Sequence, residues 1–182
     1  MRYLVFIVLG LISACSATQP GLFKNQDFDV FEVKGESYGI SRNEKYYLFL
    51  DDELLSDSTK SSLLKYGSYI LDYRGMRQTL VPDEADYYVL VSFRPYDETS
   101  KEQVFQISGG SRKVFEVTNE FRPRWWISST YLGERPKHDK MIPMHAISVR
   151  DFLGASRSGM PQIMKYRRND VLVRHVVEKV EQ

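Results

Sequence analysis

The alternation of hydrophobic and polar positions predicts a series of strands along most of this 182-residue chain. Lys45–Leu50 is a continuous apolar and aromatic run bounded by charged residues, which is typical of a strand buried on both faces. Ala85–Phe93 (A-D-Y-Y-V-L-V-S-F) has the strongest strand pattern. Further strands are predicted at Asp27–Val33, Gln103–Ile107, Lys113–Val117, Arg124–Leu132, His145–Phe152 and Gln162–Arg167.

A first helix is predicted from about Asp57 to Arg74, where apolar residues recur at helical spacing. Ser56 is suited to cap its N-terminus, and Gly75 is suited to the position just after its C-terminus. Gly67 lies on the apolar face and lowers helix stability relative to alanine. We therefore expect Gly67 to be there because the helix closely approaches a sheet.

A second helix is predicted from Asn169 or Asp170 to the end of the chain. Apolar residues again share one helical face, but several are valines, and β-branched side chains favour a strand as the alternative. Gly109-Gly110 suits a tight turn, so Gln103–Ile107 and Lys113–Val117 are interpreted as a hairpin. Gly133–Pro143 is polar and is interpreted as a loop.

This order of elements predicts an α+β fold. One strand–helix–strand unit is followed by a run of strands, which favours a mostly antiparallel sheet with two helices packed on one face. We find no internal repeat, so residues 27–182 are expected to form a single domain.

The N-terminus has the anatomy of a secretory signal. Arg2 precedes the apolar run Leu4–Ile12, which is too short to span a bilayer as a helix. Ile12-Ser13-Ala14-Cys15 follows and resembles the lipobox of bacterial lipoproteins, in which cleavage occurs before a cysteine that becomes acylated. The alternatives are an ordinary secretory signal with a chance cysteine and a buried N-terminal strand.

The lipobox resemblance implies that residues 1–14 are a signal peptide and that Cys15 is the lipidated first residue of the mature chain. Residues 15–26 then form a short flexible tether that reaches at most about 40 Å, at about 3.3–3.6 Å per residue. Ser16 after the cysteine implies the outer membrane rather than the inner membrane. We expect a periplasm-facing protein anchored by two or more acyl chains, which bind a membrane stably.

Composition excludes several classes of protein. The whole chain has a net charge of +1, and removal of residues 1–14 leaves 168 residues with 24 basic and 24 acidic side chains. A neutral chain lacks the basic surface of a general nucleic-acid binder. Cys15 is the only cysteine, so no internal disulfide is possible. The 42% of hydrophobic residues is enough for a folded core.

The mature chain also resembles small bacterial outer-membrane lipoproteins that carry a domain of unknown function. The resemblance rests on Gly75, Ala85-Asp86-Tyr87-Tyr88-Val89, the segment Ile147 to Asp151 and the terminal segment from Asn169. The family's tryptophan after the late turn is replaced by Lys165-Tyr166, and its closing apolar-proline pair is absent. The resemblance implies a lipoprotein and brings no accepted activity with it.

No set of residues forms a complete catalytic, metal or cofactor site in the sequence, so we expect none of the three. His138, His145 and His175 do not have metal-ligand spacing. Ser62-Leu63-Leu64-Lys65 matches S-x-x-K without its partner motifs. Asp51-Asp52-Glu53 is interpreted as a solvated strand end. Asp86 is expected to accept backbone hydrogen bonds and fix a turn.

Phe121–Trp126 contains the best candidate for a contact surface. In a strand, Trp125 and Trp126 point to opposite faces, so one of them is available to stack on a sugar or a partner side chain. Arg122 and Arg124 lie beside them and give the composition of an interface anchor. The alternative is a core tryptophan with a solvated arginine rim.

Three functions follow from these patterns. The first is a non-enzymatic lipoprotein that binds an envelope protein or a glycan, or assists envelope assembly, with Arg122, Arg124, Trp125 and Trp126 as its contact surface. The second is an envelope hydrolase acting on peptidoglycan or lipid, which needs polar side chains from separate strands to converge in a cleft. The third is a soluble periplasmic ligand-binding domain that does not depend on Cys15.

Overall fold

The computed structural model describes residues 28–37, 40, 42–50, 55–96, 99, 102–133, 141–153, 160–167 and 170–182. Cys15, the expected signal peptide and tether, the Asp51-Asp52-Glu53 cluster and His138 lie outside these residues. The strands are β1 (Phe28–Glu36), β2 (Lys45–Leu50), β3 (Arg77–Gln78), β4 (Tyr87–Arg94), β5 (Gln103–Ser111), β6 (Pro123–Tyr131) and β7 (Gln162–Arg167). The helices are α1 (Asp57–Tyr73), the short 3-10 helix η1 (Pro82–Glu84), α2 (Arg112–Thr118), α3 (Ile142–Phe152) and α4 (Val171–Glu181).

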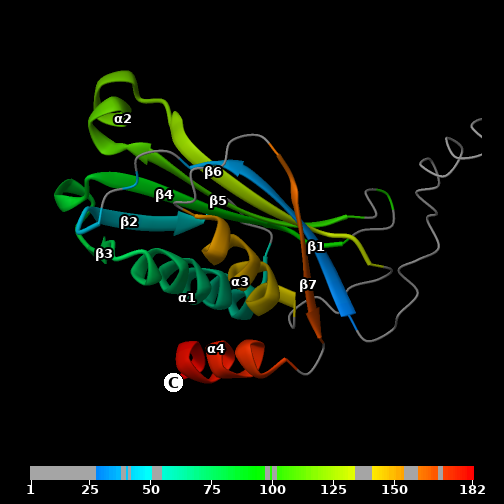
Figure 1. Cartoon of the computed structure of the whole chain (residues 1–182). Coiled ribbons are helices and arrows are strands. Elements are labelled where there is room, and N and C mark those ends of the chain that lie inside the picture. The colour runs from blue at the N-terminus through cyan, green and yellow to red at the C-terminus, as the bar shows by residue number, and fades with distance from the viewer. Residues whose placement is uncertain are drawn as a thin grey trace, which may run out of the picture.

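The strands form one mixed sheet in the order β3-β2-β4-β5-β6-β1-β7 (Figure 1). β2 pairs parallel to both β3 and β4. The other neighbouring pairs, β4–β5, β5–β6, β6–β1 and β1–β7, are antiparallel. The expected fold class, a mostly antiparallel sheet with two helices, is therefore wrong. The sheet is mixed because α1 connects β2 to the β3–β4 region and returns the chain to the same end of the sheet, so that β4 runs parallel to β2. The described residues contain four α-helices rather than two.

The segment His145–Phe152 is helical, and its prediction as a strand is wrong. It belongs to α3, in which every residue from Ile142 to Arg150 is buried. A helix that is surrounded by other elements has no polar face, so the alternation of Ile147 and Val149 did not distinguish a strand from a buried helix. Pro143 lies in the first turn of α3, where proline favours the start of a helix. This signal lies at the end of Gly133–Pro143, which was interpreted as a loop.

The predicted hairpin is also wrong, because Gly109 and Gly110 lie within β5 rather than in a turn. A Cβ atom on Gly109 would lie 2.2 Å from the Trp125 ring, and one on Gly110 would lie 2.7 Å from the Arg122 carbonyl oxygen. The glycines therefore allow close approach of β6. The following residues form α2 and return the chain to the sheet.

The predicted local signals around the two amphipathic helices are confirmed. The Ser56 side chain accepts a hydrogen bond from the Thr59 amide at the start of α1, and Gly75 after α1 has a φ of 81°. A Cβ atom on Gly67 would lie 3.0 Å from the Val91 side chain, which confirms the close approach to the sheet. Asp170 caps α4, so the terminal segment is a helix.

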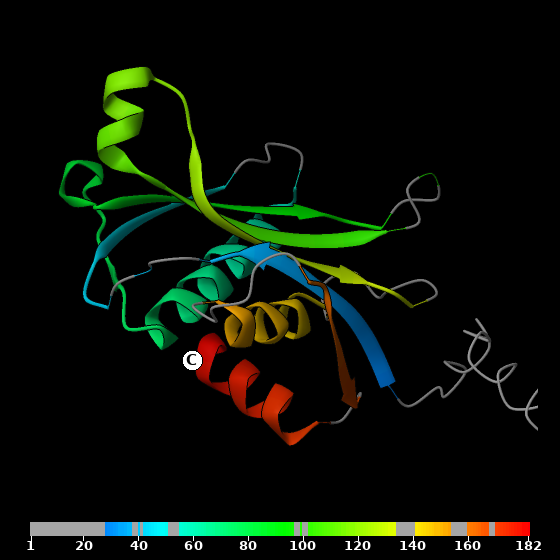
Figure 2. The same cartoon turned by 45° about the horizontal axis from the view of Figure 1, so that its top comes forward.

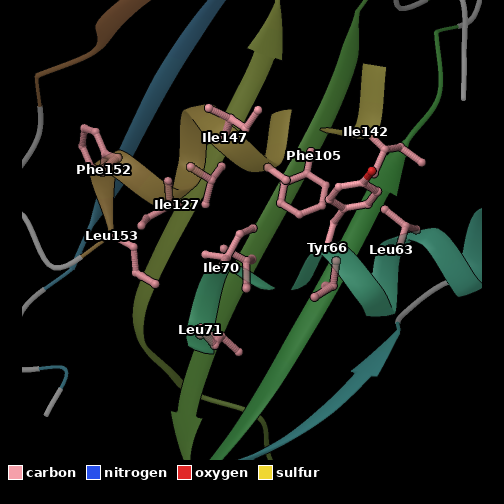
Figure 3. Packing of buried hydrophobic residues seen from close by; sticks show 14 of the residues in the cluster. Leu63, Tyr66, Ile70, Leu71, Phe105, Ile127, Ile142, Ile147, Phe152 and Leu153 are labelled. Carbon is pink, nitrogen blue, oxygen red and sulfur yellow. The ribbon is translucent and has the colours of Figure 1, made fainter. Parts of the chain in front are cut away.

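Three helices lie on one face of the sheet. α1 and α3 pack directly on the strands, and α4 packs against both of them (Figure 1). Apolar side chains of α1 and α3 meet Phe105 and Ile127 from the central strands (Figure 3). α2 lies at one end of the sheet, away from the other helices (Figure 2). We call the face under α1 and α3 the covered face and the opposite face the open face.

Candidate partner-binding face

The structure separates the four residues that the sequence brought together as one contact surface. Trp125 is 1% exposed and belongs to the core, whereas Trp126 is half-buried on the open face. Arg124 is exposed and donates a hydrogen bond to the Tyr87 hydroxyl at 3.0 Å. Arg122 is exposed and pairs with Glu120 at 2.7 Å. Trp126 is therefore the member that is placed to contact a partner on the open face.

The alternation of burial along β4 identifies which side chains share the open face with Trp126. Val89 and Val91 are buried under the helices, so Tyr88 and Leu90 point the other way. The strand register then places Phe49, Leu90, Ser108 and Trp126 in one row across four strands. In this row, Leu90 of β4 and Ser108 of β5 lie between Phe49 of β2 and Trp126 of β6, so Phe49 and Trp126 share the open face with two strands between them.

These residues form an aromatic patch with two side chains from the α2 region. Tyr88 contacts Tyr47, Phe49 and Phe115, with ring centroids 6.2, 6.4 and 5.3 Å apart. Phe121 contacts Phe49 at 5.8 Å and lies over Gly110. All four ring pairs meet edge to face, which is a favourable geometry for aromatic contacts. The aromatic patch is defined as Tyr47, Phe49, Tyr88, Phe115, Phe121 and Trp126, and each member is half-buried.

Helix α2 forms one border of the patch and exposes apolar side chains. Val114 is 40% exposed and Val117 is 86% exposed. Four charged residues here form two ion pairs, since Arg112 pairs with Glu116 and Arg122 pairs with Glu120. The border of the patch therefore combines exposed valines with two ion pairs and the exposed Lys113.

A buried polar atom lies close to Trp126 on the same face. Ser128 follows Trp126 by two residues in β6, so both side chains point to the open face. Its hydroxyl is buried and has no hydrogen-bond partner among the described residues. A buried hydroxyl without a partner is uncommon, because leaving it unpaired costs about 1–3 kcal/mol.

A separate polar trio lies in the core, on the covered face. His145 is fully buried, with Nδ1 2.9 Å from the Ser129 hydroxyl and Nε2 3.2 Å from Oε1 of Gln103. Because Oε1 only accepts, Nε2 donates to Gln103 and Nδ1 accepts from Ser129. Burial lowers the pKa of His145 to about 3, so the ring is neutral at ordinary pH.

This trio contains a serine next to a histidine, but it does not form a cleft. Phe31, Phe93 and Phe105 surround the imidazole ring, with centroids 4.8, 6.2 and 6.3 Å away. Ser129 is also fully buried, and the third member is an amide rather than a carboxylate. No substrate reaches a hydroxyl in this position, so the trio is a structural part of the core.

Other candidate residues have structural surroundings. Asp86 accepts a hydrogen bond from the Lys45 amide at 2.8 Å, which confirms the predicted backbone hydrogen bond, but this bond links the starts of β2 and β4 rather than fixing a turn. His175 is exposed on α4. Across the part of the chain that the structure describes, no group of three or more acidic, histidine or cysteine residues could hold a metal ion. No helix within the same residues is both long and apolar enough to cross a membrane.

The sequence interpretation included Phe121 and predicted that one of Trp125 and Trp126 is exposed, without deciding which, and it missed the other four members of the patch. Tyr47 and Phe49 were assigned to a strand buried on both faces, because apolar runs look alike whether one or both faces are covered. Tyr88 was assigned to a strand without a prediction of which residues face solvent. Phe115 was placed in a hairpin strand. The one available signal was the neighbouring pair Tyr87-Tyr88, whose members must lie on opposite faces of a strand.

Comparison with models of known protein families gives no match, and comparison with curated proteins gives none. Two solved structures of PelC dodecamers from Paraburkholderia phytofirmans are among the structures to which this chain has a low similarity. One, a variant, is 14% identical with a TM-score of 0.43 and covers 65% of this chain and 93% of its own. The other is 13% identical with a TM-score of 0.44 and covers 71% and 99%. At these TM-scores the likeness carries no argument about function.

Proposed function

We propose that this chain is a lipid-anchored bacterial envelope protein that faces the periplasm and binds a protein partner without catalysing a reaction. The aromatic patch and the exposed valines of α2 form the contact surface. The observation that carries this proposal is the position of the patch. Six half-buried aromatic residues lie on the face of the sheet that, among the described helices, only α2 borders.

The chemistry of the patch favours a protein over a glycan as the partner. Tyrosine, tryptophan and phenylalanine are enriched at protein interfaces, and their loss commonly dominates binding energy. The rings contact one another edge to face and are held in place, so little side-chain entropy is lost on binding. Two arginines beside the patch, Arg112 and Arg122, are paired with glutamates, which reduces their attraction for an ionic ligand.

The anchor is argued from the sequence alone. Acyl chains on Cys15 and a tether of about 12 residues restrict the domain to within about 40 Å of the membrane surface, at about 3.3–3.6 Å per residue. A partner in the same membrane then meets the domain at a raised effective concentration. A modest contact area on the open face is sufficient under these conditions.

The anchor is tested by palmitate labelling and membrane fractionation of wild type and Cys15→Ala. The expected result is that wild type is labelled and sediments with outer-membrane markers, whereas Cys15→Ala is unlabelled and leaves that fraction. Equal labelling and equal fractionation of the two proteins would contradict the anchor and favour the soluble periplasmic alternative.

The contact surface is tested by crosslinking in intact cells, with a photoreactive amino acid at position 126. A matched control carries the same group at position 94, at the far end of the open face on β4. We expect position 126 to form an adduct with one other protein, identified by mass spectrometry, and Tyr88→Ala to reduce its yield. Position 94 is expected to form little adduct.

Three outcomes at position 126 contradict the proposed contact surface, and a fourth comes from the comparison with position 94. The first three are the absence of an adduct at position 126, adducts only with a second copy of this chain, and adducts only with glycan. An equal yield from positions 94 and 126 also contradicts it, because the contact is then not specific to the patch.

A further inference from the structure

A second group of aromatic side chains lies on the opposite side of the molecule, in a groove between α1 and α4. The groove has a volume of about 600 Å³, which is within the usual range for small-ligand sites. Tyr69 and Tyr73 line it, together with the polar residues Lys65, Ser68, Gln78 and Lys179. Neither the anchor nor the aromatic patch includes any of these residues.

The two tyrosines are held in position from beneath by Arg150. Its guanidinium group donates to the Tyr69 hydroxyl at 2.8 Å and lies 4.6 Å from the centroid of the Tyr73 ring. Arg150 is itself buried and pairs with Asp151. Tyr73 nevertheless remains 58% exposed. The structure therefore presents a fixed aromatic surface to solvent.

The groove carries an excess of positive charge. Within the described residues, neither Lys65 nor Lys179 forms an ion pair, and both side chains are exposed. Asp72 is the carboxylate in the groove, and it accepts a hydrogen bond from the buried Tyr46 hydroxyl at 2.8 Å. Burial and this carboxylate raise the pKa of Tyr46, so the hydroxyl keeps its proton and remains a donor to Asp72.

A second hollow of about 470 Å³ shares Asp72 and Tyr73 with the groove. Two further cations, Arg42 and Arg74, line it. Arg74 donates to the backbone carbonyl oxygens of Arg150 and Asp151, which carry no net charge, so these hydrogen bonds do not neutralise its guanidinium group. The exposed Tyr73 ring therefore lies where two hollows with positively charged borders meet.

We propose that this groove binds an acidic saccharide. The exposed Tyr73 ring would stack on the C–H face of a sugar ring, and Lys65 and Lys179 would bind its carboxylate or phosphate, with Lys179 already 6.0 Å from the centroid of the Tyr69 ring. Ser68 donates to Oε1 of Gln78 at 3.1 Å, which leaves the Gln78 amide NH₂ to hydrogen-bond a sugar hydroxyl group. The rings are tilted by 40° with centroids 6.4 Å apart. The two rings are therefore not parallel and do not form the slot in which a planar base would stack.

The adjoining hollow extends the site beyond one sugar ring. An oligosaccharide can pass over Tyr73 from the Lys65–Lys179 side to the Arg42–Arg74 side, with cations at both ends. The inference is independent of the proposed protein contact, because the groove and the aromatic patch share no residue. Failure of one leaves the other standing.

The test is calorimetric titration of the full chain, purified in detergent, with trigalacturonate. Neutral galactotriose and tripolyphosphate serve as comparison ligands, since they carry the sugar without charge and the charge without sugar. Vesicles containing lipid A, whose sugars are phosphorylated, form a second arm that distinguishes a glycolipid from a free glycan. We expect trigalacturonate or lipid A to bind at least about tenfold more tightly than either comparison ligand, a difference of 1.4 kcal/mol.

The variants separate stacking from charge. Tyr73→Ala and the double variant Lys65→Glu/Lys179→Glu are each expected to weaken binding about tenfold or more, whereas Tyr73→Phe keeps the ring and changes affinity less than about threefold. Lys113→Glu, an exposed reversal on α2, is the matched control and is expected to have no effect. These lysines are exposed, so the variants fold.

Two results overturn the inference. The first is no binding of trigalacturonate or lipid A vesicles. The second is binding that tripolyphosphate reproduces and Tyr73→Ala leaves unchanged, because charge alone then explains it.

Discussion

The two faces of the sheet use aromatic side chains differently, and the neighbouring residues Trp125 and Trp126 show the contrast. Trp125 lies on the covered face, where its ring packs over Gly109 and is removed from solvent. Trp126 lies on the open face, half-buried among side chains that reach solvent. The covered face holds the fold together, and the open face carries aromatic surface in excess of what the fold needs.

This difference teaches how to separate stability from recognition in the molecule. A side chain on the covered face has its neighbours on all sides, so its removal leaves a cavity. A side chain on the open face has neighbours on one side, so its removal exposes little new surface. Substitutions on the two faces are therefore expected to affect different measurements.

The largest expected effect is that of Trp125→Ala. Removal of this buried ring leaves a cavity beside Gly109 and is expected to lower the free energy of unfolding by about 3–5 kcal/mol. Chemical denaturation monitored by circular dichroism measures the change. A loss below about 1 kcal/mol would mean that Trp125 is not part of the core, and the distinction between the faces would fail.

The next effect concerns pH and the buried His145. Its folded pKa of about 3 lies below the unfolded value near 6.5, so the unfolded chain takes up a proton that the folded chain does not. Stability from this residue is complete above pH 6.5 and is lost as the pH falls toward 3. We expect a loss of about 1.5 kcal/mol between pH 6.5 and 5, because the slope is half its maximum of about 1.4 kcal/mol per unit at pH 6.5 and approaches that maximum at lower pH.

Denaturation at pH 6.5 and pH 5 isolates this contribution through two variants. His145→Gln removes the titrating group and is expected to flatten the pH dependence. His175→Gln, at an exposed position on α4, is expected to leave it in place. The same pH dependence in His145→Gln as in wild type would contradict a neutral, buried imidazole.

A smaller effect is expected for Phe115→Ala, which removes the contact between α2 and Tyr88. The ring pair has centroids 5.3 Å apart and contributes about 0.5–1.5 kcal/mol beyond burial. We expect a loss of about 1 kcal/mol and faster amide exchange in α2, with exchange in β4 unchanged. Hydrogen exchange with mass spectrometry checks this, and slow exchange in α2 of the variant would contradict the role of Phe115.

The smallest effect on stability is expected for Trp126→Ala. Because this ring is only half-buried, its loss is expected to cost less than about 1 kcal/mol, in contrast to Trp125→Ala. The measurement is the same denaturation experiment, with Trp125→Ala as the internal reference. Equal losses in the two variants would show that both faces contribute to one core.

The sequence predicted elements well where only one face of an element is buried. The periodicity of α1, its Ser56 cap and Gly75 each have a local cause in the chain, and all three are present. α3 was not predicted, because almost all of its residues are buried. A helix without a polar face does not show the periodic alternation of apolar and polar residues that identifies helices in a sequence. Gly109 was interpreted as part of a turn, because the side chain that requires a glycine there, the ring of Trp125, lies on another strand.

The same limit applies to the contact surface. The sequence predicted that one of Trp125 and Trp126 is exposed, since adjacent strand residues point to opposite faces, but it did not determine which of the two. The remaining members of the patch come from β2, β4 and the α2 region, and only the strand register brings them together. The two tyrosines of the groove are one helical turn apart on α1, but the groove also requires α4, which packs there only in the folded chain.

The most direct test of the central claim is hydroxyl-radical footprinting of the open face in intact cells and in the purified protein. The proposed partner contact predicts that oxidation of Tyr88 and Trp126 falls several-fold in cells, because the partner covers them. Met160, which is 80% exposed and lies outside the patch, is expected to be oxidised equally in both. Equal oxidation of Tyr88 and Trp126 in cells and in the purified protein would contradict the account.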